Sequence, residues 1–593
     1  MVIKKVHIKN WRSIKEIELD YEKVMIFIGQ NNHGKSNLLS ALLFFFGEIK
    51  YDELDFNQNS DELFVEVTFS NLDDFDKNQF KKYLTSENEI KVRKTANKSG
   101  QFTYNGYIQN PDEEWLKEEN VSNYLKRESA SQLPLYNLIP AEGRITKDMF
   151  INAINQYIEQ NHTNINFSYE LENNNFLGLK NVAKGIFGSV FYIPSVKSAS
   201  DELNLKGSTL FNQLYSSVIQ KMSETNQDYK DAKDKIVTMV NSLNKIDENG
   251  NTNTARPSEL NIFEERLERE LSSWNTKIDV EITPPNFDDV FKVGTSVWVN
   301  DGIRTDISRK GHGLQRALIF ALIKTWANII REERENAEAT PEEERPNRQT
   351  SDSTYFIFEE PELYLHPQAQ RELFSSLVLL SASENQILLC THSSSFIDMN
   401  MYKSICIVKK ENDKVGTTIF QCKTELFSDA DDKKNFNLVH WFNPDRSELF
   451  FSKKVVLVEG PTDKTVIPFL AKQLNIFRYD YTLIECGSKD AFVPYIELLN
   501  KFRLPYIAVY DKDHQTDKKP DGIASADKSS KRIEDAIDPD YGSTIIFEND
   551  IEEEIGITDK SNKSKPFFAL KKVDADDFVI QKEFKEKITK IYS

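Results

Sequence analysis

Blocks of apolar and polar residues at the start of the chain predict strands that lead into a helix. The opening IKKVHIKNWRSIKEIELD predicts two strands, and VMIFIG predicts a third. A loop and a helix that starts near Lys35 follow in QNNHGKSNLLSALLFFF. Residues 62–69, ELFVEVTF, alternate well enough for another strand, whereas residues 110–185 are rich in Asn and predict no clear element.

The middle of the chain mixes helical and strongly polar stretches. Residues 200–275 favour helices with a polar break at DENGNTNTARPSE, which indicates an inserted arm or a dimerisation unit. Residues 331–353 are highly charged and contain two prolines, so we expect a solvated loop there. The apolar runs STYFIFEE and NQILLCTH that follow predict two further strands.

Strands and helices alternate regularly after a junction near residues 440–450. The apolar runs VVLVEG, YTLIECG, YIAVYDKD and STIIFEND are separated by helical stretches, which is typical of a parallel α/β sheet. We therefore predict an α/β protein with four segments, at residues 1–200, 201–290, 291–445 and 446–593.

Composition narrows the class of protein. A chain of 593 residues is too long for one core, and 39% hydrophobic with 28% charged residues is typical of a soluble globular protein. No apolar run approaches the roughly 20 residues that cross a bilayer, and the N-terminus lacks a signal peptide, so we expect a cytoplasmic protein without membrane contact. The net charge of −19 argues against indiscriminate coating of nucleic acid, although a local basic groove or a metal site remains compatible with it. The four cysteines form no CxxC pair, so neither a disulfide framework nor a zinc site is supported.

The loop after the third strand matches a phosphate-binding motif. Gly29-Gln-Asn-Asn-His-Gly34-Lys35-Ser36 has the form GxxxxGK[ST], with a strand before it and a helix after it. Glycines let backbone N–H groups converge on phosphate oxygens at a helix N-terminus. Lys35 would reach the β and γ phosphates and Ser36 would bind Mg²⁺. The sequence thus predicts a site for ATP with Mg²⁺.

Two later strand ends could complete the nucleotide site. Glu359 and Glu360 end the strand YFIF, where the first would support the metal ion and the second would polarise the attacking water. His392 follows the strand QILLC, where it could sense the γ-phosphate.

These motifs resemble those of ABC-type ATPases of the SMC and recombination-repair kind. The resemblance rests on GxNxxGKSN and on the stretch RKGHGLQR at 309–316, which sits where the signature motif of that group falls. In that group the signature of one subunit completes the ATP site of another, which implies a homodimer or a higher homo-oligomer. His312 and Leu314 depart from the usual LSGGQ form, which puts fast turnover in doubt. The resemblance implies that ATP is bound by Gly29, Asn32, Gly34, Lys35, Ser36, Asn37, Glu359, Glu360 and His392, and in trans by Gly311, Gly313 and Gln315.

Acidic residues follow three of the predicted C-terminal strands. Glu459 ends the first, where Gly460 lets the chain turn, and Asp511 and Asp513 end another with a spacing that aims both carboxylates to one side of the sheet. A third cluster, ENDIEEE at 548–554, trails the strand STIIF. The carboxyl ends of parallel strands meet along one edge, and like charges held close there need a cation such as Mg²⁺ or Mn²⁺.

Three acidic strand ends could hold two metal ions roughly 4 Å apart, which would stabilise the attacking and leaving oxygens in phosphodiester cleavage. Lys565 could neutralise charge on the phosphate in the transition state. Taken one at a time, the acidic clusters also fit a solvated turn or a charged helix start.

The order of these acids resembles the Toprim fold, whose signature is a strand-ending glutamate followed by DxD. An ABC-type ATPase followed by a Toprim unit resembles the OLD family of nucleases, in particular its phage-defence members. The resemblance implies an N-terminal ABC-type ATPase with a largely helical insertion, and a C-terminal Toprim parallel α/β domain with two Mg²⁺ or Mn²⁺ ions. The family's metal-binding acids and active-site lysine fall on Glu459, Asp463, Asp511, Asp513, Asp550, Glu552 and Lys565, with Glu548 or Glu554 as alternatives in the third cluster.

Lysines surround the predicted metal site. They would contact phosphates with salt-dependent affinity and little sequence preference, although a lysine-rich mobile loop explains residues 512–532 equally well. The residues concerned are Lys512, Lys518, Lys519, Lys528, Lys531, Arg532, Lys563, Lys565, Lys571 and Lys572.

The resemblance implies an ATP-regulated, metal-dependent DNA endonuclease that nicks DNA or cuts both strands as the effector of an anti-phage defence system. Relatives work with a helicase, or with a reverse transcriptase and its DNA product, so a partner of that kind is expected. Two alternatives stay open: an ATP-gated nucleic-acid sensor or scaffold without cleavage, and a Toprim topoisomerase or primase.

Overall fold

The fold of the chain was obtained as a computed structural model, in which two compact units are defined: Met1–Ser195 with Pro346–Ser593, and Val196–Arg345. The four predicted segment boundaries stay a prediction. The residues that the structure describes are 1–58, 60–161, 165–179, 182, 185–195, 209, 211–212, 215–216, 218–219, 222, 226–246, 252–254, 256–271, 277–282, 297–339, 351, 353–382, 385–410, 412, 414–425, 444–514, 520–557 and 565–593.

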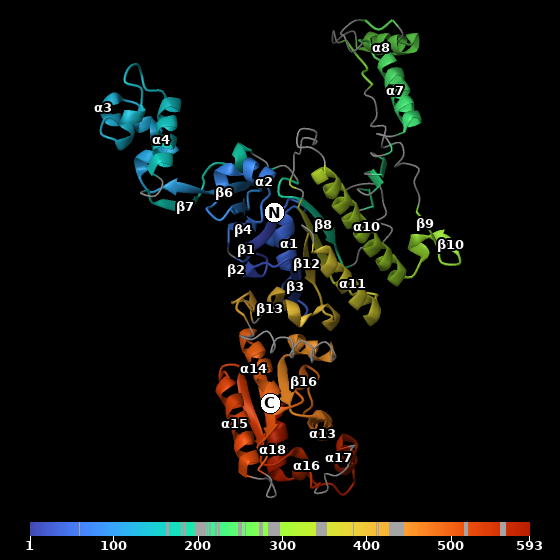
Figure 1. Cartoon of the computed structure of the whole chain (residues 1–593). Helices are drawn as coiled ribbons and strands as arrows, with labels where there is room; N and C mark the ends of the chain where they lie inside the picture. Colours follow the sequence, from blue (N-terminus) through green and yellow to red (C-terminus); the bar gives the residue numbers. More distant parts are fainter. Residues whose placement is uncertain are drawn as a thin grey trace. The chain divides into compact units, whose positions relative to one another are not determined.

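The first unit opens with an antiparallel sheet of six strands in the order β2-β1-β4-β5-β6-β7 (Figure 1). Its two opening strands and the strand predicted at 62–69 are confirmed. Burial alternates strictly along β5, as expected for a strand with one face packed on a core. The strands are β1 (Val2–Trp11), β2 (Ile14–Asp20), β4 (Glu62–Ser70), β5 (Ile90–Asn97), β6 (Phe102–Pro111) and β7 (Phe167–Leu171).

A second sheet of six strands has the order β14-β13-β3-β12-β11-β8. Five of its strands are parallel, and only the edge strand β14 runs antiparallel to its neighbour. Strands β3, β11 and β12 were predicted from their apolar runs, and their near-complete burial is typical of a parallel sheet. The strands are β3 (Val24–Ile28), β8 (Ser189–Ile193), β11 (Thr354–Glu359), β12 (Asn385–Cys390), β13 (Ile405–Lys410) and β14 (Thr417–Gln421).

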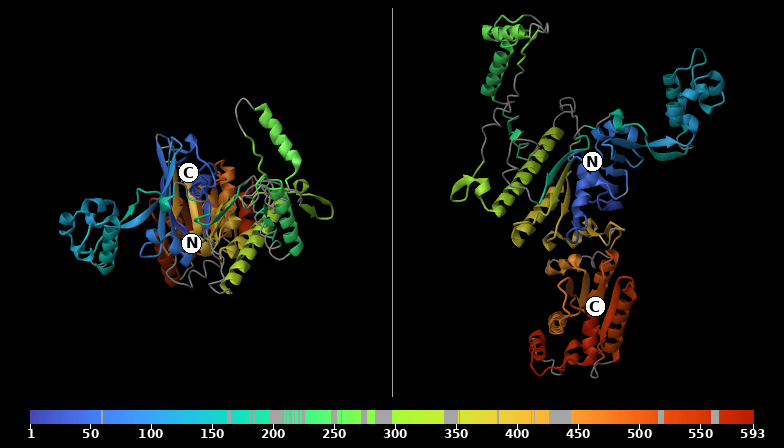
Figure 2. Two further views of the ribbon diagram at one scale, coloured as in Figure 1. Left: turned by 90° about the horizontal axis from the view of Figure 1, so that it is seen from above. Right: turned by 180° about the vertical axis from the view of Figure 1, so that it is seen from behind.

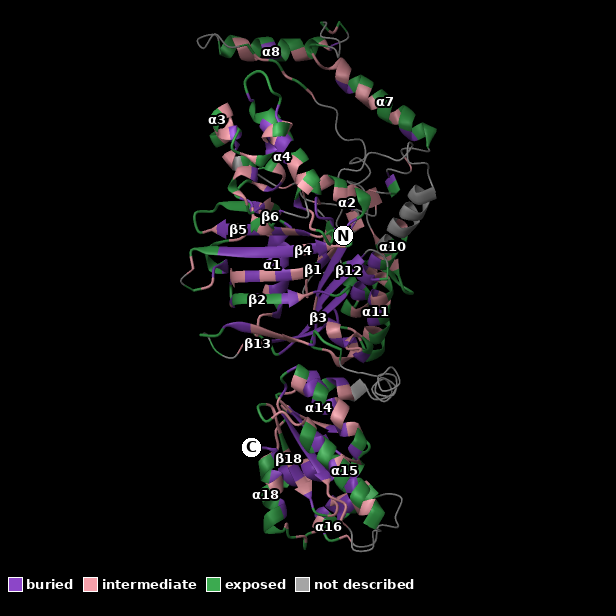
Figure 3. Ribbon diagram, turned by 60° about the vertical axis from the view of Figure 1, so that its left-hand side comes forward, coloured by how far each residue is buried: buried purple, intermediate pink, exposed green. Residues whose placement is uncertain are grey.

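Helix α1 (Lys35–Phe45) belongs to the same core as both sheets. Its run LLSALLFF is buried on every side, so one core joins Trp11 of β1, Phe69 of β4, Phe44 of α1 and Leu388 of β12. A helix that is apolar all round must be covered by protein on all sides, which explains why the sequence here shows no polar stripe. In this way the core holds the first turn of α1, and therefore Lys35, against the sheets. Figure 3 colours the chain by burial, with the buried residues in purple.

A buried carboxylate links strands of the first sheet. The Glu66 side chain is only 3% exposed and lies 2.7 Å from both Lys91 Nζ and Arg93 Nη2. Tyr107 Oη donates a hydrogen bond to Glu66 Oε2 at 2.6 Å, and His7 Nδ1 lies 3.7 Å from Oε1. Burial opposes ionisation, but the hydrogen bonds from His7, Lys91 and Tyr107 outweigh it and lower the pKa of Glu66 to about 2.

Glu66→Gln is expected to destabilise the protein by about 3 kcal/mol at pH 7, since the carboxyl pKa falls from 4.5 to about 2 on folding. A lowered carboxyl pKa stabilises the folded state above pH 4.5, and this contribution is lost as the pH falls towards 2. Urea unfolding of parent and variant between pH 7 and pH 3 measures the difference. The control is Glu16→Gln, whose exposed side chain contacts the same His7; an equal difference at pH 7 and pH 3 would contradict the prediction.

A third sheet, close to the C-terminus, contains four parallel strands in the order β16-β15-β17-β18. The parallel α/β arrangement predicted from residue 455 onward is therefore confirmed. The strands are β15 (Lys454–Val458), β16 (Tyr481–Glu485), β17 (Tyr506–Asp511) and β18 (Gly542–Phe547). Helices connect these strands and follow the last one, and Figure 2 shows them in orange and red. The helices are α13 (Pro461–Gln473), α14 (Phe492–Lys501), α15 (Pro520–Ala536), α16 (Ile551–Glu554), α17 (Lys565–Val573) and α18 (Lys582–Ile591).

Further helices lie outside the three sheets. Those of the first unit are α2 (Asp74–Gln79), α3 (Arg127–Ala130), α4 (Lys147–Asn161) and α11 (Pro367–Leu380). The second unit contains the pair β9 (Trp298–Asn300) and β10 (Arg304–Asp306), and the helices α7 (Gln227–Ser242), α8 (Ser258–Glu270) and α10 (His312–Ala339). No helix in the described ranges has the length and apolar character needed to cross a membrane.

A stretch predicted to be a loop, and another for which a loop was one of two readings, are partly helical. The charged stretch 331–353 was expected to be a loop, but α10 continues to Ala339, because Glu, Arg and Ala favour helices and the first proline comes only at position 341. Likewise, residues 520–532 of the lysine-rich stretch belong to α15, which starts at Pro520 with Asp521 in its first turn.

Candidate functional site

The phosphate-binding motif forms a tight loop between β3 and α1. Gly29 has φ 151° and Gly34 has φ 102°, in the region that favours glycine. A Cβ atom on Gly29 would lie 2.2 Å from the carbonyl oxygen of Val408 in the neighbouring strand β13. Both the backbone conformation and the close approach of β13 therefore require glycine at position 29, as the motif predicts.

Lys35 and Asn37 tie the first turn of α1 to its surroundings. Lys35 is buried, and its Nζ donates to the carbonyl oxygens of Gly29 and Gln30, each at 3.0 Å. Burial lowers the pKa of Lys35. Asn37 Nδ2 donates to Ser13 Oγ at 2.7 Å, which links α1 to the turn between β1 and β2. Lys35 thus lies inside the loop that it would serve, whereas Asn37 has a structural contact of its own.

Glu359 is the last residue of β11 and Glu360 follows it, close enough to the phosphate-binding loop for both charges to act on Lys35. Glu359 Oε2 accepts a hydrogen bond from Tyr192 Oη at 2.9 Å. Glu360 has φ 47°, a conformation that costs free energy for a residue with a side chain, and its carboxylate lies 3.7 Å from His392 Nε2. Burial and the neighbouring Lys35 lower the pKa of His392, which favours the neutral imidazole.

Glu362 is a nearby acid to which the sequence assigned no role. Its side chain is buried, and Oε1 accepts a hydrogen bond from the backbone N–H of His392 at 2.6 Å. Burial raises the pKa of Glu362. The negative charges of Glu359, Glu360 and Glu362 raise the pKa of Lys35 and so oppose the larger effect of burial. The structure therefore gathers Lys35, the glutamates and His392 at one sheet edge.

The predicted signature residues belong to the second unit. Gly311 precedes α10, and Gly313 and Gln315 lie in its first turn. Gln315 is buried and donates from Nε2 to the carbonyl oxygen of Lys310 at 2.8 Å. Their action on the ATP site of another subunit stays a prediction.

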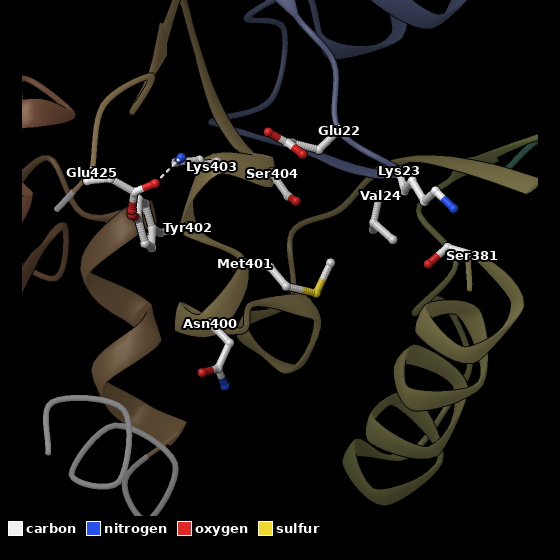
Figure 4. Close-up of a pocket in the computed structure, with 10 residues that line it drawn as sticks. All are labelled: Glu22, Lys23, Val24, Ser381, Asn400, Met401, Tyr402, Lys403, Ser404 and Glu425. Atoms are coloured by element: carbon white, nitrogen blue, oxygen red, sulfur yellow. Dashed lines mark hydrogen bonds and ion pairs between the residues drawn. The ribbon is translucent and has the colours of Figure 1, made fainter. Parts of the chain in front are cut away.

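The opposite edge of the second sheet contains a pocket of about 280 Å³ (Figure 4). It is formed where β3, β12 and β13 begin, so it lies at the amino ends of strands whose carboxyl ends carry the nucleotide motifs. At the pocket, Lys403 forms an ion pair with Glu425, drawn as a dashed line in Figure 4, and Tyr402 donates a hydrogen bond to Glu425. We assign this pocket no part in the nucleotide site.

The third sheet brings acids from separate parts of the sequence to one edge. Strand β15 pairs with β17, and β17 with β18, so their carboxyl ends are neighbours. Glu459 directly follows β15, Asp511 ends β17, and Asp550 comes three residues after β18. Asp463 lies in the first turn of α13, directly after β15. The charges of Asp463, Glu459, Asp550 and Asp513 all raise the pKa of Asp511, which places these acids within electrostatic reach of one another.

Asp463 and Asp511 each have a buried carboxylate oxygen at this acidic edge. Asp463 Oδ1 and Asp511 Oδ1 are buried without a hydrogen-bond partner in the described part of the chain. Burial, reinforced by neighbouring acids, raises the pKa of Asp463 to about 7 and that of Asp511 to about 9. Buried carboxyl groups without donors are costly, and a cation would relieve that cost.

The acids of the third cluster, at residues 548–554, make two kinds of contact: some bond to the chain near Asp463 and α16, and others pair with lysines. Glu552 is buried, accepts a hydrogen bond from Thr462 Oγ1 at 3.1 Å, and raises the pKa of the adjacent Asp463. Asp550 caps α16 through its Oδ1, which accepts from the backbone N–H of Glu553 at 3.0 Å. By contrast, Glu548 pairs with Lys512 at 3.0 Å and Glu554 with Lys587 at 2.6 Å. The choice of Asp550 and Glu552 over these two alternatives stays a prediction.

The structure corrects two local arguments from sequence. Gly460 has φ −141°, an extended conformation open to any residue, so the chain does not need glycine there to turn. Its N–H instead donates to Asp463 Oδ2 at 3.0 Å. Asp513 lies beyond the end of β17 with φ 62°, so a turn, and not the alternation of a strand, sets the direction of its side chain.

Lys489 contacts the acidic edge and was missed by the sequence reasoning. It opens a 3₁₀ turn (Lys489–Ala491) after β16, its side chain is only 7% exposed, and its Nζ lies 2.9 Å from Asp513 Oδ2. The available signal was its position in ECGSKD, just after the carboxyl end of a fourth parallel strand. A buried cation here fixes the orientation of Asp513.

If Asp513 binds a metal ion, Lys489→Met is expected to weaken Mn²⁺ binding about 10- to 100-fold, because a partner that orients a metal ligand commonly contributes that much. Titration of the parent and the variant with Mn²⁺ measures the two affinities. Arg478→Met, which removes an exposed pair with Asp480 at the amino edge, is the control; equal effects of the two variants would argue against a positioning role.

The other basic residues predicted to contact phosphates differ in exposure and in their contacts. Lys565 is exposed at the start of α17, and Lys571 and Lys572 are exposed in its last turn. Arg532 lies 3.3 Å from Asp490, and Lys531 lines a pocket of about 290 Å³ beside α15 with Lys512. Lys518, Lys519 and Lys563 lie outside the described residues.

The acidic edge fits a hard divalent cation by its donor chemistry. The side-chain atoms that could bind a metal ion here are carboxylate oxygens, which Mg²⁺ and Mn²⁺ prefer, and Asp463 Oδ1 and Asp511 Oδ1 are buried without hydrogen bonds among the described residues. No three His, Cys, Asp or Glu residues in the ranges described form a ready-made metal cage. The argument that a divalent cation fits this edge therefore rests on the carboxylate oxygens and on their burial.

Comparisons with known proteins identify two domains in the chain. The family model described as "AAA ATPase domain" matches residues 1–397, and "Overcoming lysogenization defect protein-like, TOPRIM domain" matches residues 450–513. The second match includes Glu459, Asp463, Asp511 and Asp513, whereas Asp550 and the residues after it lie beyond it.

Several relatives carry nuclease names. The Old nuclease of Escherichia phage P2 is 24% identical over 481 residues, which cover 79% of this chain and 70% of the phage protein. The OLD nuclease of Thermus scotoductus is 32% identical over 161 residues (26% of this chain, 30% of that protein). Endonuclease GajA of Bacillus cereus is 26% identical over 182 residues (27% and 26%). Among solved structures, an SMC head bound to the C-winged helix domain of ScpA is 12% identical, with a TM-score of 0.34 over 71% of this chain and 98% of that chain.

The fold and the matches define an endonuclease that joins an ATP-binding domain to a Toprim domain. The chain belongs to the OLD family, with its AAA ATPase domain at residues 1–397 and its Toprim match at residues 450–513.

Proposed function

We propose that the protein is an ATP-regulated, divalent-metal-dependent DNA endonuclease. The observation that carries the proposal is the convergence of carboxylates from β15, α13, β17 and α16 at one sheet edge, with Asp463 Oδ1 and Asp511 Oδ1 buried and without hydrogen bonds in the described chain. An edge of this kind needs positive charge, and metal ions would supply it.

Each residue of the acidic edge has a proposed role. Glu459, Asp463 and Asp511 would hold one metal ion, and Asp513, Asp550 and Glu552 would complete a two-ion site. When bound, Mg²⁺ or Mn²⁺ stabilises the attacking and leaving oxygens of phosphodiester hydrolysis. Lys489 keeps Asp513 in place, and Lys565 would oppose charge on the scissile phosphate.

ATP would act as a regulator in this proposal. Lys35 and Ser36 would bind its phosphates and Mg²⁺, with Glu359, Glu360 and His392 facing the γ-phosphate. Gly311, Gly313 and Gln315 of a second subunit would complete the site, so ATP would close a homodimer or higher oligomer. The departures from LSGGQ at His312 and Leu314 support slow turnover and therefore a regulatory role.

DNA is the proposed substrate, and anti-phage defence is the proposed setting. The nuclease names of the relatives and the lysines of α15 and α17 support DNA as the ligand. The resemblance to phage-defence members of the OLD family supports the setting, with a helicase, or a reverse transcriptase and its DNA product, as partner.

Plasmid cleavage under six conditions tests the proposal: with and without ATP, each in Mg²⁺, in Mn²⁺ and in EDTA without added metal. Nicked or linear DNA that requires metal, with a rate that ATP changes, is the expected result. Relaxed closed circles would indicate a topoisomerase, and binding without cleavage in every condition would indicate a sensor or scaffold; either result overturns the proposal.

A further inference from the structure

Two neighbouring aromatic side chains stand exposed on α17. Phe567 is 65% exposed and Phe568 is 42% exposed, and their rings are 5.7 Å apart at an interplanar angle of 87°. The helix has another face that is well packed, with Ala569 and Val573 buried in the core of the C-terminal sheet. The smaller apolar side chains of α17 therefore pack in the core, whereas its two largest, Phe567 and Phe568, are exposed.

We infer that Phe567 and Phe568 form a platform on which unpaired bases of the DNA substrate stack. The inference rests on the proposed nuclease function and adds a substrate class to it: DNA with a single-stranded segment near the cleaved bond. Aromatic rings on a basic surface bind single strands because every base has a flat face, while lysines track the phosphates.

The charge around the two rings favours nucleic acid over a protein partner. Lys565 precedes the pair, and Lys571 and Lys572 follow it within the nine residues of α17, all three exposed. α17 itself carries no acidic residue, and the acids Asp574, Asp576 and Asp577 come only after it ends. A polyanion with flat apolar faces complements both features, whereas a duplex covers its base faces by stacking.

The position of α17 places the pair next to the proposed chemistry. α17 packs against α13, and Figure 1 shows the two helices side by side at the C-terminal sheet. α13 carries Asp463 in its first turn and, with 13 residues, is about 20 Å long. A base stacked on α17 thus lies within a few nucleotides of the acidic edge.

The test is binding of two labelled oligonucleotides in EDTA, so that cleavage plays no part. One probe is a fully paired duplex, and the other is the same duplex with a central stretch of mismatched, unpaired bases. The double variant Phe567→Ala/Phe568→Ala is expected to bind the unpaired probe roughly 5- to 100-fold more weakly than the parent and the duplex nearly as well. Phe567→Tyr/Phe568→Tyr keeps two stackable rings and should restore the preference.

Tyr479→Ala is the matched control, because Tyr479 is 91% exposed but precedes β16 at the amino edge of the same sheet. Equal affinity of the parent and the Phe567→Ala/Phe568→Ala variant for the unpaired probe overturns the inference. A change in oligomeric state with equal losses on both probes overturns it too and indicates a protein contact. Since the assay needs no cleavage, a failure of the proposed nuclease activity in the plasmid assay would be seen separately.

Discussion

Asp511→Asn is expected to lower the rate of DNA cleavage by about 100-fold or more without loss of folded stability. Removing one carboxylate from a metal site takes away several kcal/mol of charge stabilisation in the transition state. The folded state should not suffer, because burial and neighbouring acids raise the pKa of Asp511 to about 9. At pH 7 the metal-free protein therefore carries a neutral carboxyl group at this position, and Asn has nearly the same shape and charge.

The experiment compares plasmid cleavage in Mg²⁺ and Mn²⁺ with the thermal midpoint in metal-free buffer. The matched control is Glu548→Gln, which neutralises an exposed acid of the third cluster that pairs with Lys512. We expect the control to cut at close to the parental rate and both variants to melt at or above the parental midpoint. Parental cleavage by Asp511→Asn, or a loss that follows a lower midpoint, would remove the basis for the metal site.

Those parts of the fold whose cause is local could be predicted from the sequence. The phosphate-binding loop needs glycine at positions 29 and 34, since both residues adopt positive φ, and the motif records that need directly. Strands such as β3 and β15 are buried on both faces and read as continuous apolar runs. Several of the acids come directly after such runs. The sequence alone therefore places them at strand ends, even without the order of the strands in the sheet.

What the sequence did not reveal depends on contacts between distant segments. The order β16-β15-β17-β18 makes the ends of β15 and β17 neighbours, and nothing local encodes that pairing. Lys489 contacts Asp513, and Glu362 contacts His392, through the same kind of long-range packing. The turn at Asp513 was missed because the DxD spacing suggested a continuing strand, whereas the strand ends at Asp511.

Lys35→Ala is the second variant with a large expected effect: ATP should bind about 10- to 100-fold more weakly. Hydrogen bonds between charged groups contribute about 1.5–3 kcal/mol, and Lys35 is the one cation that the motif directs at the β and γ phosphates. The side chain is held in the loop by the carbonyl oxygens of Gly29 and Gln30, so its loss changes the site and not the surrounding core.

Titration with a fluorescent ATP analogue measures the affinity, and plasmid cleavage with and without ATP measures the coupling. The control is Lys4→Ala, which removes an exposed lysine of β1 that pairs with Glu89. If ATP regulates cleavage from its own site, Lys35→Ala should cut DNA at the parental rate seen without nucleotide and should no longer respond to ATP. Asp511→Asn should show the reverse pattern, with ATP binding intact and cleavage lost. Two centres that fail independently would place regulation in the ATPase domain and chemistry in the Toprim domain, whereas loss of both activities in either variant would contradict that division.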